Sequence, residues 1–507
     1  MLAKVYSYGI VGLDAFKVCI EVDVSGGLPG MVIVGLPDSA IKESKERVRA
    51  AIKNSGYQFA SRRVTVNLSP ADVKKEGPLF DLAMALGILA ATGQIDPALL
   101  NDFAFLGELS LDGRVQPIQG VLSAARRSDS MGLIVPLANA QEAALVKTAR
   151  IYPVQTLNEV VHFLTNRTAI KPLEINVENL LSRINQHDMD FADVKGQPHV
   201  KRGLEIAAAG GHNVLLIGPP GSGKSMLAKR LPSILPDMSL QEALETTQIH
   251  SVMGFLKPNQ PLVSARPFRS PHHTSSYIAL VGGGSIPKPG EVTLSHNGIL
   301  FLDELPEFNR NVLESLRQPL EDHCVTVARA LKTVRFPSKF MLVAAMNPCP
   351  CGWFGSRRKE CHCSAQQVQK YLAKISGPLL DRIDIHLEVP ALRYQELSTQ
   401  SLAENSLQIR ERVNQGRRIQ IERLQAEGIL GNAQMSHKQL RKFCALGPEE
   451  NELFKTAAAE LNFSARAYDK ILRVARTIAD LAAAKDIKIE HLAEAVQYRS
   501  LDRNWWG

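Results

Sequence analysis

Short apolar runs separated by glycine, proline and asparagine characterise the first third of the chain. Val18–Val24, Met31–Val34 and Val64–Leu68 are rich in valine and isoleucine and are bounded by turn-forming residues, which predicts three strands. Residues 38–54 follow a helical periodicity that begins at capping residues. The continuous apolar run from Leu82 to Ala91 predicts a buried helix. This third of the chain is therefore a mixed α/β structure.

The pattern changes three more times along the chain. Residues 1–170 form the first α/β domain, and residues 171–192 are polar and aperiodic, as a linker is. An α/β pattern returns over residues 193–390, and residues 391–507 are mostly helical in periodicity. We expect three domains and one linker, which agrees with a typical domain size of roughly 150 residues.

Composition and charge limit the possible partners only weakly. Of 507 residues, 45% are hydrophobic and 22% are charged, and the net charge of +8 permits a nucleic-acid partner without requiring one. The longest apolar run, Leu82–Ala91, is too short for a membrane span, and the N-terminus lacks the pattern of a secretory signal. We expect a cytoplasmic protein with no membrane partner.

A phosphate-binding loop follows a short apolar strand, Val214–Ile217, and precedes a helical pattern. This arrangement of strand, GxxxxGK[ST] loop and helix predicts an ATP site in which backbone N–H groups surround the phosphates. Lys224 would reach the β- and γ-phosphates, and the hydroxyl of Ser225 would bind Mg²⁺. The predicted nucleotide-binding residues of the loop are Gly218, Pro219, Pro220, Gly221, Ser222, Gly223, Lys224 and Ser225.

Polar residues follow two further apolar runs. Asp303 and Glu304 follow the apolar run Gly298–Leu302. We expect Asp303 to bind Mg²⁺ and Glu304 to polarise the attacking water. Asn347 follows the apolar run Phe340–Ala345 and Met346. Its side chain could orient the lytic water, or it could only form a turn before Pro348.

Together with the run Leu379–Asp384, these motifs resemble an AAA+ ATPase of the magnesium-chelatase/MCM-like branch. The whole chain, to the run Tyr498–Arg503, resembles the YifB/ComM family. The resemblance implies a Lon-protease-like N-terminal α/β domain, an AAA+ P-loop core with a parallel sheet, and a C-terminal α-helical lid. It also implies that Arg382 reaches a neighbour's ATP in a homohexameric ring. Arg466, with Arg473 as the alternative, would be the sensor arginine of the lid. The competing interpretation for each is a surface salt bridge.

Two basic segments are candidates for DNA contact. Lys224 and Asp303 are 79 residues apart, and the inserted stretch carries His272 and His273 in a basic, hydroxyl-rich run. A second segment, residues 329–339, has four basic residues and no acid, and its pattern predicts a β-hairpin. Related MCM-like motors touch DNA with this hairpin. Arg329, Lys332 and Arg335 suit phosphate contact, although a solvated hairpin is the alternative.

Four cysteines, Cys349, Cys351, Cys361 and Cys363, fall within fifteen positions. Such local clustering predicts a structural Zn²⁺ site with four thiolates. The alternatives are an iron–sulfur cluster, free thiols, or replacement of one cysteine by His362.

The N-terminal domain resembles the Lon peptidase fold over residues 75–84 and 107–115. Leu79 stands where the family has its nucleophilic serine, and Leu122 stands near the position of the lysine base. Because neither group is present, we expect this domain to be non-proteolytic.

The resemblance implies a hexameric, ATP-driven DNA translocase or branch-migration helicase that acts in natural transformation. ATP, Mg²⁺ and a structural Zn²⁺ are the expected cofactors. Single-stranded and branched DNA, and a recombinase–DNA filament, are the expected partners. A magnesium-chelatase-like motor and a MoxR-like protein-remodelling chaperone are the alternatives.

Overall fold

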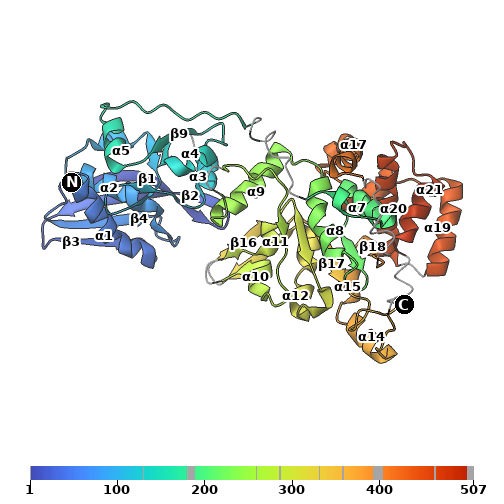
Figure 1. Ribbon diagram of the computed structural model, residues 1–507. Coiled ribbons are helices and arrows are strands. Elements are labelled where there is room, and N and C mark those ends of the chain that lie inside the picture. The colour runs from blue at the N-terminus through green and yellow to red at the C-terminus, as the bar shows by residue number, and fades with distance from the viewer. Residues whose placement is uncertain are drawn as a thin grey trace. The chain divides into compact units, whose positions relative to one another are not determined.

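The computed structural model describes residues 2–128, 131–177, 180, 189–257, 260–284, 287–329, 332–356, 359–391, 404–461 and 464–499. It divides into two compact units (Figure 1). The first comprises residues 1–184 and 240–264, and the second comprises residues 185–239 and 265–507. Most of the linker between 178 and 188, and the part of the run Tyr498–Arg503 beyond Arg499, lie outside the described residues.

The first unit contains a seven-stranded mixed sheet in the order β3-β4-β2-β1-β5-β8-β9. The pairs β1·β2 and β2·β4 are antiparallel, and the other pairs are parallel. The three predicted strands are confirmed within β2, β3 and β4. The strands are β1 Leu2–Val11, β2 Asp14–Ser25, β3 Gly30–Val34, β4 Arg63–Ser69, β5 Phe103–Phe105, β8 Gly132–Pro136 and β9 Arg150–Val154, with a separate hairpin of β6 Glu108–Leu109 and β7 Val115–Gln116.

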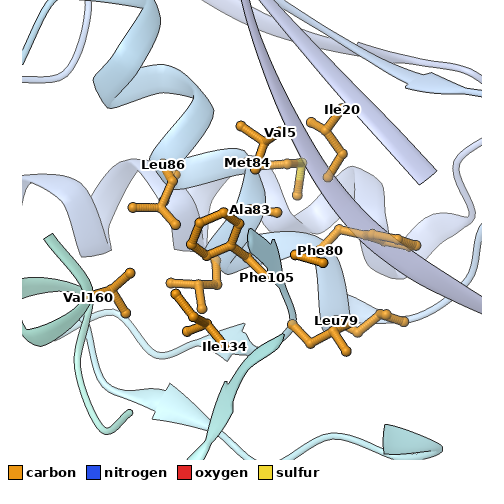
Figure 2. Packing of buried hydrophobic residues seen from close by; sticks show 14 of the residues in the cluster. Val5, Ile20, Leu79, Phe80, Ala83, Met84, Leu86, Phe105, Ile134 and Val160 are labelled. Atoms are coloured by element: carbon orange, nitrogen blue, oxygen red, sulfur yellow. The ribbon is translucent and has the colours of Figure 1, made fainter. Parts of the chain in front are cut away.

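Helix α2, Asp81–Ala91, lies at the centre of this unit and is buried along its whole length, as the apolar run predicted. Figure 2 shows Met84 and Leu86 of this helix among Val5, Ile20 and Phe105 of the sheet. The other helices are α1 Ser39–Asn54, whose N-terminus is capped by Asp38, α3 Val121–Arg127, α4 Leu137–Ala143 and α5 Leu157–Leu164.

Helix α9, Leu240–Val252, belongs to the first unit although it lies between the two nucleotide motifs in the sequence. It packs against α3. Gln248 donates to the carbonyl oxygen of Leu13 at 2.6 Å and to the hydroxyl of Ser123 at 3.1 Å, and it accepts from Arg126 at 2.6 Å. The expected core range of 193–390 thus contains a helix that folds with the other unit.

The second unit contains a five-stranded parallel sheet in the order β11-β14-β17-β10-β18. The strands are β11 Phe268–Arg269, β14 Ile299–Leu302, β17 Met341–Met346, β10 Val214–Ile217 and β18 Ile385–Glu388. The central strands β10, β14 and β17 are buried throughout, as expected for a parallel sheet covered on both faces.

Helices surround this sheet and continue into a helical C-terminal region (Figure 1). Helix α7 packs against β18 and also against α17 and α20, so the sheet and the C-terminal helices belong to one unit. The helices are α7 Pro198–Gly210, α8 Lys224–Arg230, α10 Tyr277–Val281, α11 Glu291–Leu294, α12 Arg310–Glu314, α13 Arg317–Asp322, α14 Ala365–Leu372, α15 Gly377–Leu380, α17 Ser406–Leu424, α18 His437–Phe443, α19 Pro448–Leu461, α20 Ala465–Leu481 and α21 Ile489–Gln497.

Two small hairpins complete the second unit. One pairs β12 Gly282–Gly283 with β13 Lys288–Pro289, and the other pairs β15 Cys324–Arg329 with β16 Lys332–Pro337. The second is the hairpin that the basic segment predicted. Within the described residues, no helix combines the length and the apolar character that crossing a membrane requires.

Candidate active site and cysteine cluster

The phosphate-binding loop connects the carboxyl end of β10 to the amino end of α8. Gly221 and Gly223 have φ angles of +74° and +93°, a conformation that side-chain-bearing residues rarely adopt. A Cβ atom at Gly218 would lie 2.2 Å from the carbonyl oxygen of Val389, so only glycine fits there. The local sequence therefore determines the turn that points backbone N–H groups toward a phosphate.

Lys224 is nearly buried at the start of α8. Its ammonium group donates to the carbonyl oxygens of Gly218 at 2.7 Å and Pro219 at 3.0 Å, and to Oδ1 of Asn347 at 3.1 Å. Burial lowers the pKa of Lys224, and the nearby carboxylate of Asp303 opposes that shift. The lysine is thus held between the loop and the end of β17, where a phosphate group would compete for its protons.

The structure brings Ser225 and Asp303, the pair predicted to bind Mg²⁺, into direct contact. The hydroxyl of Ser225 donates to Oδ2 of Asp303 at 2.6 Å, although 78 positions separate the two residues. They meet because β10 and β14 are parallel strands of one sheet and both loops leave from the carboxyl ends. A hydroxyl and a carboxylate at this distance fit the oxygen ligands that Mg²⁺ prefers.

Glu304 follows Asp303 with a φ angle of +53°, and its side chain is 58% exposed. Nδ1 of His273 lies 3.4 Å from its carboxylate, and the rings of His272 and His273 are 4.1 Å apart. Both histidines were predicted as DNA contacts, and the structure places one of them beside the predicted general base. Sequence reasoning missed this pairing because the two residues follow different strands.

Arg382 lies at the opposite end of the parallel strands from the phosphate-binding loop. Val214 is paired with Ile385, so the loop follows β10 at its carboxyl end, whereas Arg382 precedes β18 at its amino end. The side chain of Asn213, just before β10, donates to the carbonyl oxygen of Arg382 at 2.9 Å. A four-residue strand spans roughly 13 Å, so Arg382 does not reach the loop of its own chain.

The guanidinium of Arg382 makes an ion pair with Glu321 and also donates to the carbonyl oxygen of Pro378. Arg466 makes a 3.5 Å ion pair with Asp381 and is 62% exposed. One cavity of about 370 Å³ brings the three predicted arginines together, and its charged lining residues are Glu321, Lys339, Asp381, Arg382, Asp384, Arg466, Asp469, Lys470 and Arg473. The structure gathers these arginines but does not bring them to the phosphate-binding loop.

The basic hairpin has the register Arg329 opposite Lys332, and the structure describes the backbone of these two residues but not their side chains. Arg335 is exposed, and its guanidinium lies 2.9 Å from the sulfur of Cys324. A role of these residues in DNA contact stays a prediction.

The four clustered cysteines converge. Their sulfur atoms all lie within 4.8 Å of one another, with separations of 3.3 Å for Cys349 and Cys351, 3.7 Å for Cys349 and Cys361, and 3.6 Å for Cys351 and Cys361. Sulfur atoms bound tetrahedrally to one Zn²⁺ at about 2.3 Å are about 3.8 Å apart, so the set fits a single ion. The backbone N–H of Trp353 and the neighbouring thiols lower the pKa of Cys351 to about 6, whereas burial and the neighbouring thiols raise the pKa of Cys361 and Cys363. His362 is not part of this group.

The positions that would carry peptidase chemistry are hydrophobic and buried. Leu79 is 8% exposed and Leu122 is fully buried. The backbone N–H of Leu122 donates to the buried carboxylate of Glu142, which also accepts from Ser251 of α9. A helix from the nucleotide-binding part of the sequence therefore contacts the segment where a Lon peptidase has its base.

Comparisons with known proteins agree with this architecture. Three magnesium chelatase family models match: "Magnesium chelatase, subunit ChlI" over residues 190–397, "Subunit ChlI of Mg-chelatase" over residues 20–139, and "Magnesium chelatase, subunit ChlI C-terminal" over residues 403–499. The fold and the site define a P-loop ATPase of the magnesium-chelatase class.

Relatives extend over the whole chain. Competence protein ComM of Haemophilus influenzae is 45% identical over 99% of this chain and 98% of its own length, and YifB of Escherichia coli is 42% identical over 99% and 98%. Lon protease 2 of Bacillus subtilis is 34% identical over 28% of this chain and 27% of its own length. The chain belongs to the ComM/YifB family.

Proposed function

We propose that this protein is an ATP-driven DNA translocase that migrates branched DNA, and that it works as a homohexameric ring. The observation that carries the proposal is the position of Arg382 at the end of the strands opposite to the phosphate-binding loop. A catalytic arginine placed there serves the ATP of a neighbouring copy, as in a ring. The relative named competence protein ComM suggests that the DNA is taken up during natural transformation.

Each residue of the site has a defined task in hydrolysis. Lys224 exchanges its loop carbonyls for the β- and γ-phosphates, and Ser225 and Asp303 would hold Mg²⁺, which would offset the negative charge of the phosphates. Glu304 accepts a proton from the attacking water, and Asn347 orients that water. Arg382 of a neighbouring copy stabilises the charge that develops on the transferred phosphoryl group.

In this proposal, the basic hairpin, His272 and His273 contact DNA. A ring repeats Arg329, Lys332 and Arg335 in every copy. The repeated charges produce a strong local positive field, although the net charge of one chain is only +8. Contacts to the phosphate backbone are independent of base sequence and weaken with salt. We propose that the protein meets its single-stranded DNA substrate as a recombinase–DNA filament.

The cysteine cluster holds a structural Zn²⁺ in this proposal. Four thiolates around one ion leave no open position for a substrate, so the metal stabilises the fold and takes no part in the reaction. The sulfur separations support one ion over an iron–sulfur cluster, because the cysteines of a cluster bind different irons and stand further apart.

A magnesium-chelatase-like or MoxR-like remodelling motor is the second candidate, and the magnesium chelatase family matches favour it. A fluorescent three-strand branched substrate separates the two functions. We expect ATP-dependent strand displacement that is lost in Lys224→Ala and Glu304→Gln. ATP hydrolysis that DNA does not stimulate, even at low salt, would contradict the DNA motor and favour the remodelling role.

A further inference from the structure

The first cysteine of the cluster is placed two residues after the predicted water-orienting residue. Strand β17 ends at Met346, Asn347 follows, and Pro348 connects it to Cys349, which is fully buried. The side chain of Asn347 contacts Lys224 of the phosphate-binding loop at 3.1 Å. A metal bound to Cys349 would therefore anchor the segment that carries Asn347.

The turn between the two cysteine pairs packs directly against the phosphate-binding loop. Gly352 has a φ angle of +82°, and its N–H donates to the carbonyl oxygen of Cys349 at 2.9 Å. A Cβ atom at Gly352 would lie 2.5 Å from Cδ of Pro220. Because that contact leaves no space for even one carbon, the position of the turn limits the position of the loop.

A third contact comes from the helix that follows the cluster. Helix α14 begins two residues after Cys363, with Ser364 and Gln367 as a reciprocal capping pair. Tyr371 of this helix is buried, and the backbone of Asn347 interacts with its phenol and opposes the rise in the pKa of Tyr371 that burial causes. The cysteine cluster is thus connected to Asn347 on both sides, by the chain at Cys349 and by Tyr371.

We propose that metal occupancy of the four-cysteine site controls the ATP site by fixing Asn347 and Pro220. With the metal bound, Cys349 and Cys351 are tied to Cys361 and Cys363, which holds Gly352 against Pro220. Without it, the four thiols no longer hold this segment, and Asn347 and the phosphate-binding loop lose their support. The inference rests on the zinc and the ATPase activity proposed above. It adds that the metal is needed for nucleotide binding and not only for stability.

Metal removal provides the first test. The full-length protein is treated with a zinc-selective chelator and returned to Mg²⁺, with bound zinc measured by elemental analysis. We expect affinity for a fluorescent ADP analogue to fall at least tenfold while the far-ultraviolet circular dichroism is retained, and Zn²⁺ but not extra Mg²⁺ to restore it. Unchanged affinity in the zinc-free protein, or a purified protein that binds nucleotide with no zinc, would overturn the inference.

Two glycine variants separate the coupling from the loss of metal. Gly352→Ala leaves all four cysteines in place and adds the carbon that collides with Pro220, so we expect full zinc content with at least fivefold weaker nucleotide binding. Gly355→Ala is the matched control, because Gly355 has a similar φ angle of +74° but nothing within 4 Å of an added Cβ atom. Equal nucleotide affinity in both variants would contradict the proposed coupling between the cysteine segment at Gly352 and the phosphate-binding loop at Pro220.

Absence of DNA-stimulated hydrolysis in the zinc-loaded wild type is a separate failure that concerns only the proposed function.

Discussion

Nζ of Lys224 lies 3.1 Å from Oδ1 of Asn347, so the predicted phosphate-binding lysine and the predicted water-orienting residue are in contact although 123 positions of sequence separate them. Two neighbouring parallel strands, β10 and β17, bring them together. We expect Asn347→Ala to lower the hydrolysis rate roughly 10- to 100-fold with little change in ATP affinity, because a neutral positioning group is lost.

Asn347→Asp tests the same contact by placing a carboxylate where Asn347→Ala removes the polar group. A carboxylate beside Lys224 would compete with phosphate for the ammonium group, so ATP affinity should fall in Asn347→Asp and not in Asn347→Ala. Equilibrium binding of a fluorescent nucleotide and steady-state hydrolysis measure the two effects. Equal affinity losses in both variants would contradict the assigned contact.

Arg382 should act on the ATP of another copy. Lys224→Ala and Arg382→Ala are each expected to be inactive alone, and a mixture should recover hydrolysis because some interfaces combine an intact loop with an intact arginine. A mixture of Lys224→Ala and Glu304→Gln is the control, since both changes damage the same side of the interface. Recovery in the control, or none in the first mixture, would refute the assignment.

The hydrogen bond between Ser225 and Asp303 predicts a shared Mg²⁺ ion. Ser225→Ala and Asp303→Asn should each raise the Mg²⁺ concentration for half-maximal hydrolysis, by roughly tenfold, which corresponds to about 1.4 kcal/mol. Titration of Mg²⁺ at fixed nucleotide measures this value. A shift in only one of the two variants would contradict a common ion.

Asp81 gives the first unit a pH-dependent stability. Burial raises the pKa of Asp81 from 3.8 to about 6, although Arg47 donates to it at 2.9 Å. Because the folded state binds this proton more tightly, its contribution is fully present below about pH 4 and is lost as the pH rises through about 6. The free energy of unfolding, measured with denaturant between pH 4 and 7, should therefore fall less steeply with rising pH in Asp81→Asn than in the wild type.

The buried carboxylate of Glu142 depends on a hydroxyl from helix α9. Ser251→Ala removes that donor and should lower the free energy of unfolding of the first unit by about 1–3 kcal/mol, because a buried acceptor loses its partner. Ser61→Ala, at an exposed position, should change it by less than about 0.5 kcal/mol. Similar losses in both variants would argue against the contact.

The local sequence by itself determined the elements and their chemistry. The glycines of the phosphate-binding loop, the buried run 82–91 and the strands that precede Asp303 and Asn347 follow from backbone sterics and from side-chain burial, which act over a few residues. The four cysteines likewise lie close enough in sequence to bind one ion. Each of these features depends on spacings that the chain itself sets.

Only the tertiary structure decided which distant residues meet. Sheet order put Ser225 beside Asp303, His273 beside Glu304, and Gly352 against the phosphate-binding loop. It also placed helix α9 with the other unit. Parallel strands connect through crossovers whose length does not specify which strands become neighbours, so packing of the whole sheet made these choices.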